Sequence, residues 1–74
     1  MGRKLANKLT VNGAKLTDAR VAAGLLQQDI ADKLGCNRSA VCRWEQEFTK
    51  PNDVQIMAMA DMLGTAGFII GREK

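Results

Sequence analysis

The sequence contains no histidine and only two cysteines, Cys36 and Cys42. A structural zinc site takes four ligands drawn mainly from these two residue types, so the chain lacks a zinc-binding set, and no other cofactor is indicated. The cysteines are six residues apart in one segment and badly oriented for a disulfide. We expect reduced thiols, with Cys36 as a small core residue and Cys42 facing outward; a redox switch is an alternative that nothing requires.

Long apolar runs are also absent. The longest candidate, near the start, is interrupted by lysine and asparagine, which argues against a membrane span and a signal peptide. We therefore expect a cytoplasmic protein with no membrane partner. The sequence also offers no paired-carboxylate cleft and no phosphate-binding loop, which argues against an enzyme, and a helical domain this small leaves little pocket for a small-molecule ligand.

The sequence does contain enough apolar residues for one small core. Of its 74 residues 46% are apolar and 26% charged, with one proline, which is typical of a globular chain. So short a chain is near the lower limit for an independent fold, so help from a second subunit is expected. The net charge of +3 favours an anionic partner. The position of the positive residues matters more: Arg38, Arg43 and Lys50 lie in or just after one predicted helix.

Residues 27–46 have the pattern of two short helices joined by a tight turn. Ile30 and Leu34 are four residues apart on the first helix, and Val41 and Trp44 are three apart on the second. Each pair therefore shares one helical face, which we expect to point inward.

The predicted turn has residues suited to ending one helix and starting another. Gly35 can take the left-handed conformation that ends the helix at about 27–34, and Asn37 is an N-cap for the helix at about 37–45. Ala31 is small enough to let the two helices cross closely. The segment is thus a candidate helix-turn-helix.

Two further helices flank this motif. Asn12 is expected to cap one at about 13–23, which Gly24 closes. Its inner face would hold Leu16, Ala19, Arg20 and Ala23. A buried Arg20 needs a partner, because an unpaired buried charge is expensive.

The last predicted helix is capped by Asn52 or Asp53 and ends at Leu63 and Gly64. One apolar stripe consists of Ile56, Met59, Ala60 and Leu63, and a second of Val54, Met57, Ala58 and Met62. One stripe suffices for a core in so small a domain. We therefore expect the second to be buried against another subunit.

Residues 1–11 include Arg3, Lys4 and Lys8 without a helix start signal, and we interpret them as a flexible basic terminus. The alternatives are an arm that contacts phosphates or a minor groove, and a short strand at Leu9 to Val11.

Residues 65–74 contain Phe-Ile-Ile between two glycines, which predicts a strand, with a short fifth helix as the alternative. A lone strand needs a partner, either the N-terminal segment or the same strand of a second subunit. We interpret this segment as a dimerisation tail. The expected dimer interface consists of Met57, Met62, Phe68, Ile69 and Ile70.

The stretch LTDARVAAGLLQQDIADKLGCNRSAVCRWE, Leu16 to Glu45, resembles the Xre/Cro-type helix-turn-helix family of phage and bacterial repressors. The resemblance covers roughly residues 12–64 and depends on the combined spacing. It implies a mainly α, lambda-repressor-like bundle of four or five helices, to which we expect a short C-terminal strand to be added.

In this family the second helix of the motif lies in the major groove with its N-terminal residues at the base edges. The resemblance therefore implies that Arg38, Ser39 and Arg43 read bases, with Cys42 at the margin. Arginine can donate two hydrogen bonds to guanine O6 and N7, so we expect a half-site containing G. The alternative for both arginines is phosphate contact or an ordinary solvated charge.

The resemblance also implies phosphate contacts on both sides of that helix. Gln27 opens the first helix of the motif, where the helix dipole favours an anion, and Gln28 and Asn37 are assigned with it. The second group consists of Gln46, Thr49 and Lys50. Such contacts position a protein on DNA but carry no sequence information.

Arg20 and Glu45 match an Arg–Glu pair that links the first and third helices in the family, which would provide the partner that a buried Arg20 needs. Three features depart from the family pattern. Leu26 replaces the usual polar cap of the second helix, so packing is expected to stabilise that start; Asp53 stands at a usually apolar position; and the tail is strand-like.

Two functions are compatible with these features. The first is a repressor that binds double-stranded DNA as a homodimer on a pseudo-palindromic operator, with half-sites roughly 34 Å apart. The second is an antitoxin that binds a toxin and regulates its own promoter, suggested by the strand-like tail.

Overall fold

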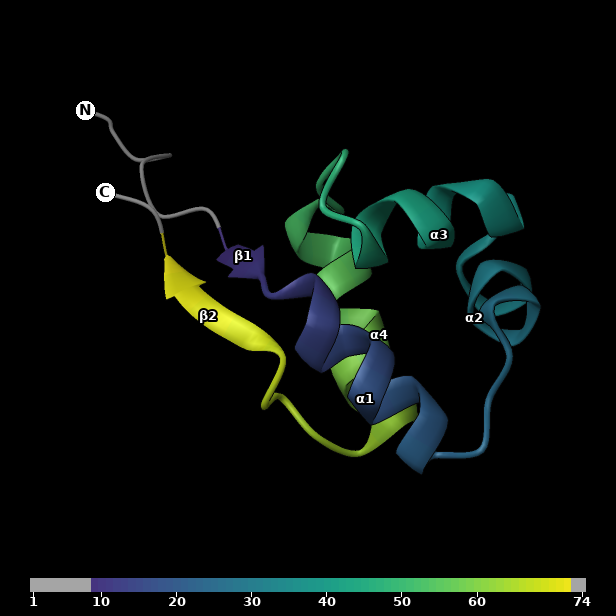
Figure 1. Cartoon of the computed structure of the whole chain (residues 1–74), viewed down its shortest axis with the longest axis horizontal. Helices are drawn as coiled ribbons and strands as arrows, with labels where there is room; N and C mark the ends of the chain where they lie inside the picture. The colour runs from purple at the N-terminus through teal and green to yellow at the C-terminus, as the bar shows by residue number, and fades with distance from the viewer. Residues whose placement is uncertain (1–8, 73–74) are drawn as a thin grey trace.

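The computed structural model describes residues 9–72, which form four helices and two strands (Figure 1). In chain order these are β1 (Leu9–Val11), α1 (Gly13–Ala22), α2 (Gln27–Leu34), α3 (Arg38–Glu45), α4 (Asp53–Leu63) and β2 (Ile69–Arg72). The helices begin and end within one residue of the predicted positions. Residues 1–8 of the expected basic arm lie outside the described range.

The first and last helices begin as predicted, at asparagine caps. The Asn12 side chain accepts a hydrogen bond from the Lys15 N–H at 2.9 Å. Asn52, and not Asp53, caps α4: its side chain accepts from the Gln55 N–H at 2.8 Å, while the Gln55 side chain accepts from the Asn52 N–H at 2.9 Å. This reciprocal pair satisfies two backbone donors that the start of a helix leaves free.

The two middle helices begin differently from the prediction. Asn37 is the N-cap residue of α3, but its side chain makes no capping hydrogen bond. Leu26 is 67% exposed, so packing does not stabilise the start of α2. Instead the Asp29 carboxylate accepts from the Leu26 N–H at 2.8 Å. Half of a capping box, supplied from the third helical position, replaces the missing polar cap.

The core draws on every helix and on both ends of the described chain. Its buried apolar members are Val11, Leu16, Ile30, Ala31, Val41, Trp44, Ile56, Met59, Leu63 and Phe68. Both predicted pairs of the central motif therefore contribute, although Leu34 is only partly buried against the core. Cys36 also packs against the core as expected, Cys42 is half-buried instead of fully outward-facing, and Ala23 is exposed.

The strand predicted in the tail is confirmed, and its partner is the N-terminal segment. β1 and β2 pair antiparallel, Leu9 opposite Arg72 and Thr10 opposite Gly71, with an irregularity before Val11 pairs with Ile69. The interpretation of residues 9–11 as a flexible terminus is therefore wrong. The alternative of a short strand at Leu9 to Val11 is the correct one, and it is the nonlocal pairing with β2 that stabilises it.

Asp53 holds the sheet to the helices. Its carboxylate accepts from the Leu9 N–H at 3.0 Å, which ties the first residue of β1 to the first residue of α4. This contact gives a structural reason for an acidic residue at the start of α4.

The structure of the tail also changes which of the expected dimer-interface residues are exposed. Phe68 is only 1% exposed and lies in the core of its own chain, so it has almost no surface to offer a second subunit. Ile69 and Met62 are partly buried against the same core. Of the five predicted residues, Met57 and Ile70 remain well exposed, at 59% and 58%.

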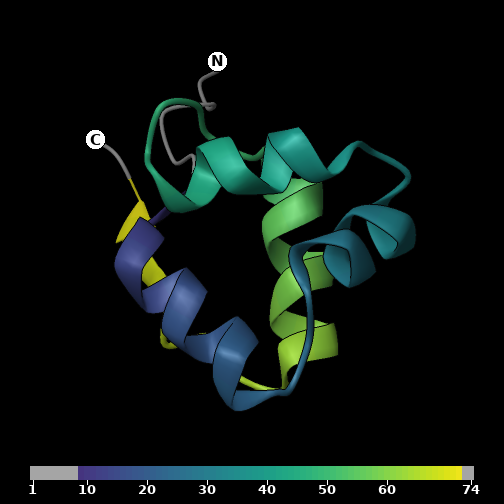
Figure 2. The ribbon, with the colours of Figure 1, turned by 45° about the vertical axis from the view of Figure 1, so that its right-hand side comes forward.

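The sheet lies at one end of the molecule and α2 at the other (Figure 1). α3 runs across one side, with α1 and α4 on the same side of it (Figure 2). Within residues 9–72 no helix has the length and apolar content needed to span a membrane. This arrangement leaves one long face of α3 uncovered.

Candidate nucleic-acid interface

The turn between α2 and α3 fixes the two helices against each other. Gly35 adopts a left-handed φ of 72°, and the Cys36 N–H donates to the Ala31 carbonyl at 3.0 Å, which closes the end of α2. Ala31 is fully buried beneath this turn. A larger side chain there would push the helices apart, because a close-packed interior has no spare volume.

The helix that follows the turn is buried on one face and open on the other. Val41 and Trp44 are 0% and 4% exposed, so the inner face holds α3 in the core. Most of the residues predicted to contact DNA are exposed. These are Gln28, Asn37, Arg38, Ser39, Arg43, Gln46, Thr49 and Lys50. The remaining two, Gln27 and Cys42, are half-buried.

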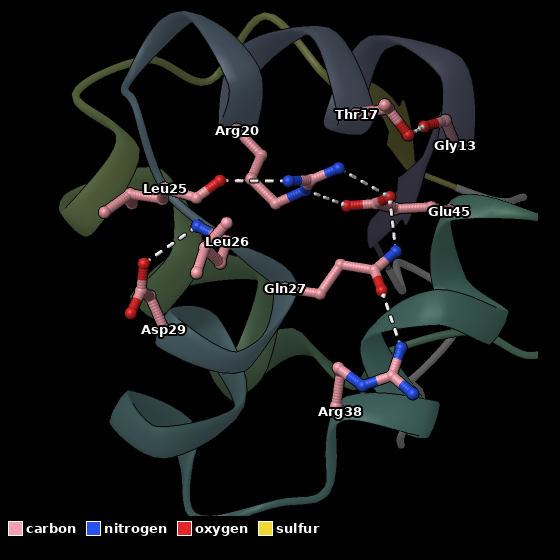
Figure 3. Close-up of polar contacts among 9 residues, drawn as sticks. All are labelled: Gly13, Thr17, Arg20, Leu25, Leu26, Gln27, Asp29, Arg38 and Glu45. Atoms are coloured by element: carbon pink, nitrogen blue, oxygen red, sulfur yellow. Dashed lines mark hydrogen bonds and ion pairs between the residues drawn. The ribbon is translucent and has the colours of Figure 1, made fainter.

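Arg20 and Glu45 form the expected ion pair (Figure 3). The Arg20 Nε donates to a Glu45 carboxylate oxygen at 2.7 Å, and a second guanidinium nitrogen approaches the other oxygen at 3.4 Å. The side chains are 15% and 6% exposed. A third nitrogen of Arg20 donates to the Leu25 carbonyl at 2.9 Å, so Arg20 joins α1 to α3 and to the start of the α2 segment.

Gln27 extends this pair to the exposed face of α3 (Figure 3). Its amide nitrogen donates to Glu45 at 3.0 Å, and its amide oxygen accepts from the Arg38 guanidinium at 3.4 Å. A chain of contacts therefore runs from Arg20 through Glu45 and Gln27 to Arg38. The contact between Arg38 and Gln27 is long and therefore weak. Gln27 thus orients the Arg38 side chain while leaving it exposed.

The start of α2 is less open to an anion than the sequence suggests. The Asp29 carboxylate already occupies the Leu26 N–H, and its charge opposes a phosphate nearby. The Gln28 side chain donates to Asp32 at 2.7 Å, along its own helix. Phosphate contact there requires these side chains to rearrange.

The predicted base readers differ in how free they are. Within residues 9–72 the side chains of Ser39 and Arg43 have no ion pair or hydrogen-bond partner, whereas Arg38 contacts Gln27. Arg43 is therefore the guanidinium most available for an external ligand. No group of three histidine, cysteine or carboxylate side chains in the described range could hold a metal ion.

Comparison with known proteins finds two similarities. A family model for a homeodomain-like domain matches residues 19–54, which span the end of α1, all of α2 and α3, and the start of α4. A crystal structure of the P22 c2 repressor protein in complex with synthetic operator 9T in the presence of Tl⁺ superimposes with a TM-score of 0.66. The match has 23% sequence identity over 72% of this chain and 80% of that chain. The chain is a helix-turn-helix domain with the lambda-repressor-like fold. No curated protein matches the sequence significantly.

A second set of contacts, which the sequence did not predict, fixes the end of α3 in the helix-turn-helix domain. Glu47, just after α3, has a left-handed φ of 63°, the one positive φ at a non-glycine residue in the described range. Its N–H donates to the Trp44 carbonyl at 3.1 Å and the Phe48 N–H donates to the Arg43 carbonyl at 2.9 Å. This is the glycine-type helix ending known as a Schellman motif, here built on a glutamate.

The contact of Glu47 with Gly13 explains why a glutamate occupies this left-handed position. The Gly13 N–H donates to the Glu47 carboxylate at 2.7 Å, at the positive end of α1. A Cβ on Gly13 would lie 2.2 Å from the Glu45 carbonyl oxygen, so only glycine permits this approach. The left-handed glutamate therefore joins the end of α3 to the start of α1. Sequence signals for it are weak, because glycine is the usual residue at this position of the motif.

Proposed function

We propose that this domain binds double-stranded DNA sequence-specifically and acts as a transcriptional repressor in the cytoplasm. The proposed active form is a homodimer on a pseudo-palindromic operator, with half-sites about one turn, roughly 34 Å, apart. The observation that carries the proposal is the contrast across α3, whose inner face is buried while Arg38, Ser39 and Arg43 are exposed on the other. A rigidly held helix with exposed arginines suits the major groove.

The charges on this side of the domain support an anionic partner. Arg38, Arg43 and Lys50 are exposed; the Glu45 carboxylate is paired with Arg20, and that of the exposed Glu47 accepts from the Gly13 N–H at the start of α1. The same face has polar side chains at Ser39, Gln46 and Thr49 that suit base edges and phosphates. In the P22 c2 complex a protein of this fold is bound to a synthetic operator.

Selection of bound sequences from a random DNA pool tests the proposal. We expect enrichment of a symmetric site whose half-sites contain guanine, because arginine reads guanine through two parallel hydrogen bonds. The selected sites also give the spacing between half-sites. Recovery of no enriched sequence under low-salt conditions would overturn specific DNA binding.

Replacing Arg43 with alanine should reduce operator affinity by about 1 to 3 kcal/mol and relax the preference at one position of each half-site. Binding to unrelated DNA should stay nearly constant, because the base contact contributes little there. Titration by fluorescence anisotropy on operator and scrambled duplexes measures both. Lys50→Ala is the matched control and should weaken both duplexes equally. If Arg43→Ala kept the operator preference intact, Arg43 would not read bases.

The most exposed apolar residues of α4 and β2 are the proposed subunit contact. Val54, Met57 and Ile70 are 78%, 59% and 58% exposed, which is unusual for residues of this size in a small domain. Deleting residues 65–74 is a poor test of this surface, because it would also remove Phe68 from the core. A charge on α4 tests it without touching the core.

Met57→Glu should therefore convert a dimer into a monomer at micromolar concentration, because a carboxylate in an apolar interface would be buried unpaired. Multi-angle light scattering measures the mass. Val21→Glu is the control: Val21 is 62% exposed on α1 and is not among the proposed contact residues, so the variant should keep the wild-type mass. An unchanged mass for Met57→Glu would remove α4 from the interface.

The antitoxin alternative depended on the strand-like tail. Because β2 pairs with β1 of the same chain, β2 does not need a strand from a second subunit as its hydrogen-bonding partner. Co-purification with a neighbouring gene product would favour this alternative.

A further inference from the structure

The further inference concerns Phe48, in the loop after α3. The chain has three aromatic residues, and two of them, Trp44 and Phe68, are buried in the core. Phe48 is 75% exposed. A single exposed apolar side chain is common and proves nothing alone. The backbone around it supplies the second observation.

The loop holds Phe48 in a fixed position relative to α3. Its N–H donates to the Arg43 carbonyl at 2.9 Å, and the preceding Glu47 is held at φ 63° with its carboxylate on the Gly13 N–H. Pro51, at the other end of the loop, is buried. A left-handed conformation is unfavourable for a non-glycine residue, so the surrounding contacts must fix it. The ring is thus presented from a rigid backbone.

The loop lies on the side of the domain proposed to meet DNA. It rises past the end of α3 before it returns to the start of α4 (Figures 1 and 2). Its other exposed side chains include Gln46, Thr49 and Lys50. Arg43, one turn back on α3, is also exposed; the Glu45 carboxylate is paired with Arg20, and the carboxylate of the exposed Glu47 accepts from the Gly13 N–H. The surroundings of Phe48 are therefore polar and cationic, which suits a polyanion better than an apolar protein surface.

We propose that Phe48 contacts the C5 methyl group of a thymine in the major groove, next to the base pair that Arg43 reaches. This inference depends on the proposed DNA binding. The thymine methyl is the one apolar group that a base pair presents on the major-groove edge, and phenylalanine is among the side chains that contact it. The flanking cations hold the phosphates. The ring contributes specificity for T over C, because of these two bases only thymine carries the C5 methyl group.

The test replaces each thymine of the selected operator, one at a time, with deoxyuridine, which lacks only that methyl group. For the wild-type chain we expect one position per half-site at which the change weakens binding about fourfold, the value for losing one buried methyl-sized group. Phe48→Ala should bind the thymine operator more weakly and show no difference between thymine and uracil at that position. Arg43→Ala should keep the difference.

A control variant and a mass measurement separate the possible failures. Val21→Ala removes another exposed apolar side chain and should behave as wild type. If wild type and Phe48→Ala respond alike to uracil at every position, the thymine contact is overturned while DNA binding stands. If Phe48→Ala instead changes the mass by light scattering, the ring belongs to a subunit contact and the inference is wrong. If no operator is selected at all, the proposed function fails together with it.

Discussion

Replacing Phe68 with alanine is expected to lower the free energy of unfolding by about 3 to 5 kcal/mol, the usual loss for a fully buried phenylalanine. Phe68 is 1% exposed in the core, and the adjoining backbone closes the sheet, because the Asn12 N–H donates to the Phe68 carbonyl at 2.8 Å. A domain of this size has a total stability of about 4 to 11 kcal/mol. The variant should therefore be marginally folded or unfolded at 37 °C, as measured by urea or thermal denaturation followed by circular dichroism.

Ile70→Ala is the matched control for this prediction. Ile70 is in the same strand but 58% exposed, so its truncation should change stability by no more than about 0.5 kcal/mol in a monomer. Equal effects of the two variants would mean that the tail does not complete the core. A loss at Ile70 that grows with protein concentration would instead identify a subunit contact.

The helices could be predicted from the sequence because their signals are local. Asn12 and Asn52 are polar caps, Gly24, Gly35 and Gly64 end helices, and 3–4 spacing marks the buried faces. The outward position of Arg38 and Arg43 follows from the same periodicity. Where these signals agree with each other, the helix boundaries were correct to one residue.

The contacts that were missed are nonlocal or use an unusual residue. The pairing of β1 with β2 joins residues 58 to 63 positions apart, so the sequence predicts it only as one of two possible partners for the tail and predicts the strand at Leu9 to Val11 only as an alternative. Glu47 takes a position where glycine is expected, and it does so because the start of α1 supplies a donor from 34 residues away. The contacts of the Gln27 amide with Glu45 and Arg38 were also not predicted, and its phosphate contact stays a prediction.

Arg20→Met is the second variant expected to have a large effect, a loss of about 3 kcal/mol in unfolding free energy. It leaves the Glu45 carboxylate, 6% exposed, without its cation, and an unpaired buried charge is more costly than a missing attraction. Denaturation by urea measures the loss. Lys33→Met is the matched control: Lys33 is exposed, and its variant should stay within about 0.5 kcal/mol of wild type.

The double variant Arg20→Met, Glu45→Leu separates stability from binding. It removes both charges, so it should recover most of the stability that Arg20→Met loses, as apolar replacements of buried ion pairs often do. It also leaves Gln27 without the acceptor that holds its amide, so Gln27 no longer directs Arg38. One hydrogen bond contributes about 0.5 to 1.5 kcal/mol, so operator affinity should fall roughly two- to thirteenfold in a well-folded protein. Wild-type affinity in the double variant would show that the chain from Glu45 through Gln27 does not position Arg38. Failure to recover stability would show that the pair itself stabilises the fold, beyond avoiding a lone charge.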